Sequence, residues 1–262
     1  MGKTPLQIRI APAVLESRRQ DGASEPDLRG LSRAVLSVMA EAGREVVDCY
    51  RVLAKSGDNV VGEILRGQGE FYEWTHYPKG DVYDHESHAQ YYYHAHRKAE
   101  RPGEHGHFHT FLRSKGMPKG IRPAPVAEYA RPADANDALS HLVAISMNDG
   151  GHATQLFTTN RWVTGETWYA TRDVIAMLDN FAIDLARPSW PVNRWITAIL
   201  RLFRPQIETL LIERDRVVGA WERRAPKGDV FEDRRLEVTA TVEISVDDQV
   251  RRIAAALRRH RR

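Results

Sequence analysis

The sequence has little cysteine and no long apolar run. Cys49 is the single cysteine among 262 residues, so no intramolecular disulfide can form and clusters of thiolate ligands are excluded. No apolar stretch approaches the roughly 20 residues that a membrane-spanning helix needs. The first residues lack the apolar core of a secretory signal, and Leu6 stands where N-myristoylation requires serine or threonine. We therefore expect a cytoplasmic protein without a membrane partner.

Motifs of nucleotide and hydrolase chemistry are also missing. The chain contains no GxxxxGK[ST], no GxGxxG after a predicted strand and no GxSxG. The net charge of +3 is too small to indicate nucleic-acid binding without a local basic patch. The arginines of residues 251–262 are typical of a solvated helix face, so nucleic acid is not an expected partner.

The pattern of apolar residues predicts helices at both ends of the chain and strands between them. Residues 1–26 are charged and contain proline and glycine, which predicts a mobile arm, and residues 27–262 are expected to form a single domain. From Asp27 to Leu53 apolar residues recur every three or four positions, as on one helix face. Helices are expected again from Thr171, and a short basic helix closes the chain.

Short aromatic and β-branched runs predict the strands. Their expected ranges are 70–77, 88–97, 105–113, 141–147, 152–158, 161–170 and, with clear alternation, 236–244. Residues 115–136 are rich in Pro, Gly and Ala and are expected to form a long loop over the functional site. The order of elements predicts an α+β fold: an N-terminal helix, a central antiparallel β-sheet carrying a histidine-rich hairpin, then C-terminal helices packed on the sheet.

Histidines are concentrated between residues 84 and 113. Seven of the eleven histidines lie there: His85, His88, His94, His96, His105, His107 and His109. Side chains on a strand alternate between two faces. Gln90, Tyr92, His94 and His96 would therefore share a face of the first strand, and His105, His107 and His109 a face of the second. If residues 98–104 reverse the chain, imidazoles from both strands can converge on one metal ion.

From this hairpin we predict four metal ligands, His94, His96, His107 and His109. Tyr92 and Glu104 are the expected acid–base groups or acceptors that orient a ligand. The alternative is that the histidines are polar residues of a sheet face without a metal. Whether His76, His85, His88, His105, His141 or His152 joins the site stays open.

Two known metal motifs fit poorly. His94, His96 and Glu100 match the HxHxxxE core of the first cupin motif, but the flanking glycines and a second cupin motif are missing. The spacing of His85 and His88 is one residue too short for HExxH.

A second group of candidates lies between residues 158 and 168. Arg161 could bind a carboxylate in a bidentate manner, and Trp162 or Trp168 could form the wall of a pocket. An ordinary β-hairpin with core tryptophans is an equally good interpretation.

The phrases YHAHR (residues 93–97), EHGHFHTF (104–111) and TNRWVTGE (159–166) resemble those of a family of uncharacterised bacterial proteins. The resemblance covers most of the chain from about residue 60 and implies no known activity.

The function expected from these residues is that of a metal-dependent enzyme with a histidine-rich mononuclear site. Iron, copper or zinc would suit nitrogen ligands without thiolates. The aromatic surroundings favour an oxidoreductase acting on a small molecule, an anionic one if Arg161 binds it. The alternative is a non-catalytic metal- or haem-binding carrier or sensor. The sequence does not indicate an oligomeric state.

Overall fold

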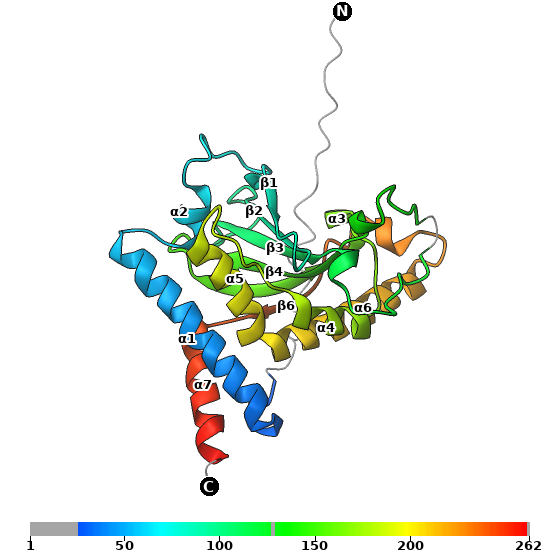
Figure 1. Cartoon of the computed structure of the whole chain (residues 1–262). Coiled ribbons are helices and arrows are strands. Elements are labelled where there is room, and N and C mark those ends of the chain that lie inside the picture. Colours follow the sequence, from blue (N-terminus) through cyan, green and yellow to red (C-terminus); the bar gives the residue numbers. More distant parts are fainter. Residues whose placement is uncertain (1–25, 127–128, 261–262) are drawn as a thin grey trace, which may run out of the picture.

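The computed structural model describes residues 26–126 and 129–260, and its centre is one six-stranded antiparallel sheet (Figure 1). Each strand pairs with the next along the chain, in the order β1-β2-β3-β4-β5-β6. The strands are β1 (Tyr77–Tyr83), β2 (Ala89–His94), β3 (Gly106–Leu112), β4 (Ser140–Met147), β5 (Ala153–Thr159) and β6 (Val238–Glu243).

Among the residues that the structure describes, two helices precede the strands, four lie between β5 and β6, and one follows β6. They are α1 (Arg33–Lys55), α2 (Val60–Leu65), α3 (Arg161–Thr164), α4 (Thr171–Met177), α5 (Trp190–Leu202), α6 (Arg204–Arg224) and α7 (Val246–Arg259). The predicted first helix begins six residues later than Asp27, because Ser32 accepts a hydrogen bond from the amide of Val35 and so caps α1. The α+β fold class is thereby confirmed.

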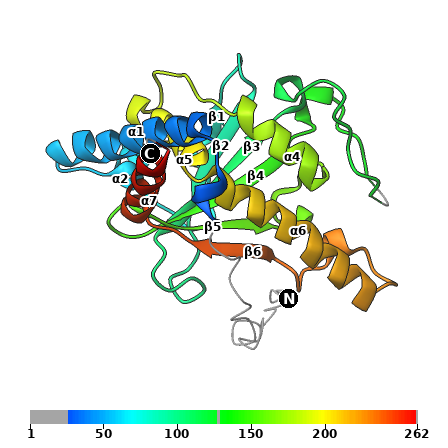
Figure 2. The ribbon, with the colours of Figure 1, turned by 90° about the horizontal axis from the view of Figure 1, so that it is seen from below.

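The helices cover one face of the sheet. Figure 2 shows α1, α5, α4 and α6 lying across the same side. On that face the Tyr91 hydroxyl donates a 2.6 Å hydrogen bond to Asn193 Oδ1, and the ring of Phe108 lies 5.4 Å from that of Trp195. Since α5 carries both Asn193 and Trp195, these contacts fix this helix against β2 and β3.

The opposite face of β2 and β3 carries the alternate residues. Tyr92 and His94 on β2 stand beside His109 and His107 on β3. The connection over residues 95–105 folds back over this face, because Arg101 places its guanidinium 4.8 Å above the ring of Phe157 on β5. Polar side chains on this face are therefore buried, although no long helix of the described residues covers them.

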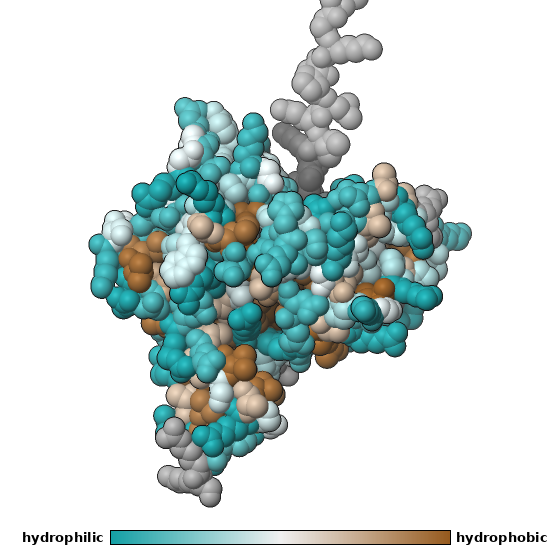
Figure 3. Space-filling model, in the orientation of Figure 1, coloured by the Kyte–Doolittle hydropathy of each residue, from teal (hydrophilic) through white to brown (hydrophobic). Residues whose placement is uncertain are grey.

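Helices α1 and α7 pack on each other and project beyond the sheet (Figure 1). Val35 and Val38 of α1 are exposed, and apolar residues reach the surface of this projection (Figure 3). In the described part of the chain no helix is both long enough and apolar enough to cross a membrane.

Two predicted strands are wrong. Residues 161–170 contain the short helix α3, because the Asn160 side chain caps it and Gly165 ends it with a positive φ. Residues 70–76 are not a strand, and β1 begins only at Tyr77. Trp74 has a φ of +68°, which no extended strand allows.

The predicted loop over residues 115–136 is present, but its contacts lie at the far end of the sheet. It leaves from the C-terminal end of β3, whereas His107 lies near the N-terminal end of that strand. Asn136 donates to the hydroxyl of Tyr83, and the amide of Ala124 donates to the carbonyl of Trp168. Residues 1–25 of the predicted arm lie outside the described residues, and the single domain over residues 27–262 stays a prediction.

We expect Gly106→Ala to disrupt the pairing of β2 and β3. A Cβ at this position would lie 2.5 Å from the carbonyl oxygen of His94 and 2.7 Å from the ring of Tyr93. Overpacking of this kind costs about 1–3 kcal/mol, to be measured as the free energy of unfolding in urea. Gly30→Ala is the matched control, because no atom lies within 4 Å of its added Cβ. Equal stabilities of the two variants would contradict this account of the hairpin.

Candidate metal centre

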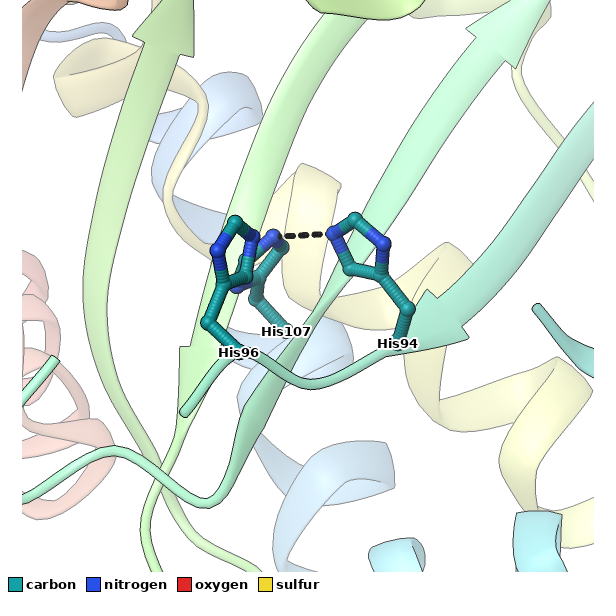
Figure 4. Close-up of side chains that lie close together, drawn as sticks. All are labelled: His94, His96 and His107. Atoms are coloured by element: carbon teal, nitrogen blue, oxygen red, sulfur yellow. Dashed lines mark hydrogen bonds between the residues drawn. The ribbon is translucent and has the colours of Figure 1, made fainter. Parts of the chain in front are cut away.

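Three imidazoles meet where β2 ends and β3 begins. The strand register pairs His94 with His107, and their Nε2 atoms are 2.6 Å apart. His96 follows β2 and turns back, so one ring nitrogen from each of the three histidines lies within 4.8 Å of the others (Figure 4). We call His94, His96 and His107 the histidine triad.

Glu104 fixes the orientation of His107. Its Oε1 lies 2.6 Å from Nδ1 of His107, which is 1% exposed. A carboxylate only accepts, so Nδ1 of His107 donates this bond and Nε2 carries the lone pair. Nε2 of His94 then donates the bond to His107. A carboxylate behind a ligating imidazole is the usual arrangement in metal sites, where it sets the tautomer and raises basicity.

His96 lies at the outer edge of the triad, with 11% of its side chain exposed. Its Nδ1 is 3.6 Å from Oε2 of Glu100, which is a looser version of the pair formed by His107 and Glu104. The ring of Trp74 meets the His96 ring edge-on, with centroids 4.0 Å apart. The solvent side of the triad is therefore bordered by an aromatic side chain.

Arg101 is a neighbour of the triad that the sequence did not single out. Its Nη2 donates a 3.0 Å bond to Oε1 of Glu237, and its Nη1 is 3.8 Å from Oε2 of Glu104. Glu104 thus lies between His107 and Arg101 and interacts with both. The connection between β2 and β3 has no periodic pattern, so only a three-dimensional structure could reveal this arginine.

Burial keeps the triad neutral. Burial, aided by the charges of nearby histidines, lowers the pKa of His94 to about 3. Burial likewise lowers the pKa of His96 and moves that of His107 well below the ordinary value. Metal ligation requires neutral imidazole. Near pH 7 the three side chains could therefore bind a metal without first releasing a proton from an imidazolium.

The donor set suits a transition metal. Within the described residues the close group contains three imidazoles and no carboxylate, which favours zinc, copper, iron or nickel over magnesium or calcium. In a tetrahedral site, metal–nitrogen bonds of about 2.0–2.1 Å place neighbouring ligand nitrogens about 3.3 Å apart. The Nε2 atoms of His94 and His107, 2.6 Å apart, would have to separate by about 0.7 Å to reach this spacing.

The fourth predicted ligand, His109, lies outside this group. Its Nδ1 is 3.0 Å from Nε2 of His141 on β4. A bulge in the pairing of β3 with β4 brings His141 opposite Phe111 and onto this face. Glu166 is buried beside them, and its Oε2 accepts from the amide of His141 at 2.7 Å. The sequence offered no periodic signal for His141 or Glu166.

Tyr92 and Arg161, the other predicted site residues, differ in their surroundings. Tyr92 is buried between two imidazole rings. The ring of His76 stacks on it with centroids 3.6 Å apart, and the centroid of the His109 ring lies 5.1 Å away. Burial raises the pKa of its hydroxyl. Arg161 forms an ion pair with Glu232 at 2.7 Å, and none of its described contacts reaches the triad.

The remaining histidines of the hairpin region lie elsewhere. His105 was expected on the face of His107, but it precedes β3 and bonds the Tyr93 hydroxyl at 2.6 Å. His88 has a φ of +60°, precedes β2 and contacts Tyr83. His85 and His152 are exposed.

The chain belongs to a protein family described as Domain of unknown function (DUF6969), whose model matches residues 40–244. The match includes all six strands and the histidine triad. It confirms the resemblance to an uncharacterised family. No curated protein and no solved structure matches the chain.

We expect the metal-free protein to lose stability as the pH falls below about 6.5, the ordinary histidine pKa. Burial, with a smaller contribution from the charge of Arg214, lowers the pKa of His141 to about 3. Between these values the unfolded chain binds the proton and the folded chain does not, so acid favours unfolding. His141→Gln removes one such group. It should reduce the slope of the free energy of unfolding against pH by up to about 1.4 kcal/mol per pH unit.

The measurement is urea unfolding of chelator-treated protein at several pH values between about 7 and 5. His85→Ala, at an exposed position, is the control for the loss of a histidine side chain. An unchanged slope in His141→Gln would contradict the buried, neutral state of this histidine.

Proposed function

We propose that this member of the DUF6969 family is a metal-dependent enzyme with one transition-metal ion held by His94, His96 and His107. The observation that carries the proposal is the convergence of three imidazole nitrogens within 4.8 Å, with Glu104 bonded behind one of them. Isolated buried histidines do not need such an arrangement, whereas a metal centre does.

Three protein ligands favour catalysis over a purely structural role. Structural zinc sites use four protein ligands, whereas catalytic sites keep a position open for water or substrate. His96 reaches the surface beside this position, so small molecules have a short path to the ion. Glu104 accepts a hydrogen bond from the His107 ring and fixes its orientation. The positive charge of Arg101 contributes to lowering the pKa of all three histidines.

An oxidoreductase acting on a small molecule is the form of this proposal that we favour. Nitrogen-only ligation without thiolates suits iron and copper as well as zinc. Aromatic rings border the triad, with Trp74 against His96 and Phe157 5.1 Å from His107. If the substrate is an anion, Arg101 is better placed than Arg161 to stabilise it, because Arg101 lies beside Glu104 and acts on the triad, whereas the ion pair of Arg161 with Glu232 does not reach the triad.

A non-catalytic carrier or sensor of metal is the second candidate. It is favoured by the position of the surface hollows. One of about 490 Å³ lies near Trp221, and one of about 340 Å³ lies near Arg252. Neither of these two hollows borders the triad, and a protein that only holds an ion needs none there.

We expect untagged protein to hold about one iron, copper or zinc ion per chain. The His94→Ala/His107→Ala double variant should lose it, because one imidazole alone holds such ions weakly. Plasma mass spectrometry of the purified protein, together with an absorption spectrum, measures both the amount and the kind of metal. Iron or copper would favour the oxidoreductase, and zinc would favour a metal-activated water.

The control is His85→Ala, which removes an exposed histidine and should keep the full metal content. The proposal fails if wild-type protein holds no metal and takes up none from iron, copper or zinc solutions.

We expect Glu104→Gln to weaken metal binding by about 10–100-fold, the usual effect of losing a carboxylate behind a ligating histidine. Glu100→Gln should have a smaller effect, because Glu100 lies 3.6 Å from His96 and 46% of its side chain is exposed. Competition with a coloured chelator measures both affinities. Equal affinities of the wild type and Glu104→Gln would show that the contact with His107 does not support ligation.

A further inference from the structure

Exposed aromatic side chains gather beside the histidine triad. Phe71, Tyr72 and Trp74 are 41%, 59% and 54% exposed, and we call them the aromatic patch. In the described part of the chain the one other large aromatic residue exposed to this degree is Trp190, at 53%. Scattered exposed apolar residues are normal, but several adjoining a polar centre mark a binding surface.

Two hydrogen bonds from backbone amides attach the aromatic patch to the sheet. The amide of Trp74 donates a 2.9 Å bond to the carbonyl of Ala95, the residue between His94 and His96. The amide of Tyr72 donates a 2.7 Å bond to the hydroxyl of Tyr77 on β1. The contacts attach the patch to the start of β1 and to the residue that follows β2 beside the triad.

Trp74 is held in an unfavourable backbone conformation. Its φ of +68° lies in the left-handed region, which bulky residues rarely adopt. Such strain persists only where the surroundings impose it, and it is concentrated at functional sites. Burial does not explain it here, because more than half of the side chain is exposed. The conformation instead brings the indole edge-on to His96, with centroids 4.0 Å apart.

We infer that Trp74 is the stacking platform for a flat aromatic ring of the substrate, whose oxygen donor binds the metal ion held by the triad. The inference rests on the proposed metal centre and names its substrate class: a small aromatic compound with a metal-binding oxygen. A ring lying on the indole is adjacent to His96, so a substituent on that ring reaches the open position of the metal. The exposed His76, stacked on Tyr92, also borders the triad, with its ring centroid 5.8 Å from that of His94.

Two hydroxamates test this inference on the full-length protein loaded with cobalt(II). Benzohydroxamate and cyclohexanecarbohydroxamate carry the same metal-binding group and the same charge, but only the first has a flat aromatic ring. Their dissociation constants are measured from the visible spectrum of the bound cobalt. We expect wild-type protein to bind benzohydroxamate about tenfold more tightly, as stacking of one ring on an aromatic side chain allows.

Substitutions at Trp74 separate stacking from simple contact. Trp74→Leu should remove the preference for the aromatic compound while binding one cobalt ion, whereas Trp74→Phe should retain most of it. Trp190→Ala, which removes an equally exposed tryptophan on α5, should change neither constant. Leu and Phe keep an apolar side chain at position 74, which guards against a variant that does not fold.

Equal affinities of the two compounds for wild-type protein, or a full preference in Trp74→Leu, would overturn the stacking role and leave the metal centre intact. A chain that binds no cobalt would overturn the proposed function and this inference together. The two failures are therefore distinguished by the cobalt content of the same samples.

Discussion

The pairing of His94 with His107 across β2 and β3 is the contact on which the rest of the site depends. Side chains alternate along both strands, so a slip of one residue would turn these imidazoles towards the helices and bring Tyr93 and Phe108 into their place. The register is held from the other face, where Tyr91 bonds to Asn193 of α5. Packing of apolar and aromatic residues on one face thus positions the polar residues on the other.

The eleven residues that connect β2 to β3 supply most of the other parts of the centre. They contribute His96 to the triad, Glu104, which bonds to His107, and Arg101, which bonds to Glu237 just before β6. Burying several polar groups together costs free energy unless each is hydrogen-bonded, and these ion pairs offset much of that cost. The span shared with the DUF6969 family contains the whole arrangement, while α7 lies beyond it.

Much of this architecture follows from periodicity. Alternation predicted the strands that became β2 to β6, and the helical repeat predicted α1. The failures occur where tertiary contacts override local pattern: Asn160 caps a helix in an aromatic run, and Trp74 interrupts a predicted strand with its positive φ. Alternation also brought His94 and His107 together. It could not show that His96 leaves the strand and turns back, that a bulge brings His141 to His109, or that Arg101 folds over Phe157.

The X-ray absorption spectrum of the metal-loaded protein tests the central claim most directly, because it reports the atoms bound to the ion. For zinc the account predicts nitrogen ligands at about 2.0–2.1 Å, with the outer-shell scattering of three imidazoles and one further light atom in the open position. His96→Ala should reduce the imidazole contribution to two, and His109→Ala should leave it unchanged. A first shell dominated by water or carboxylate oxygen, or an imidazole signal unaffected by His96→Ala, would contradict a centre built from His94, His96 and His107.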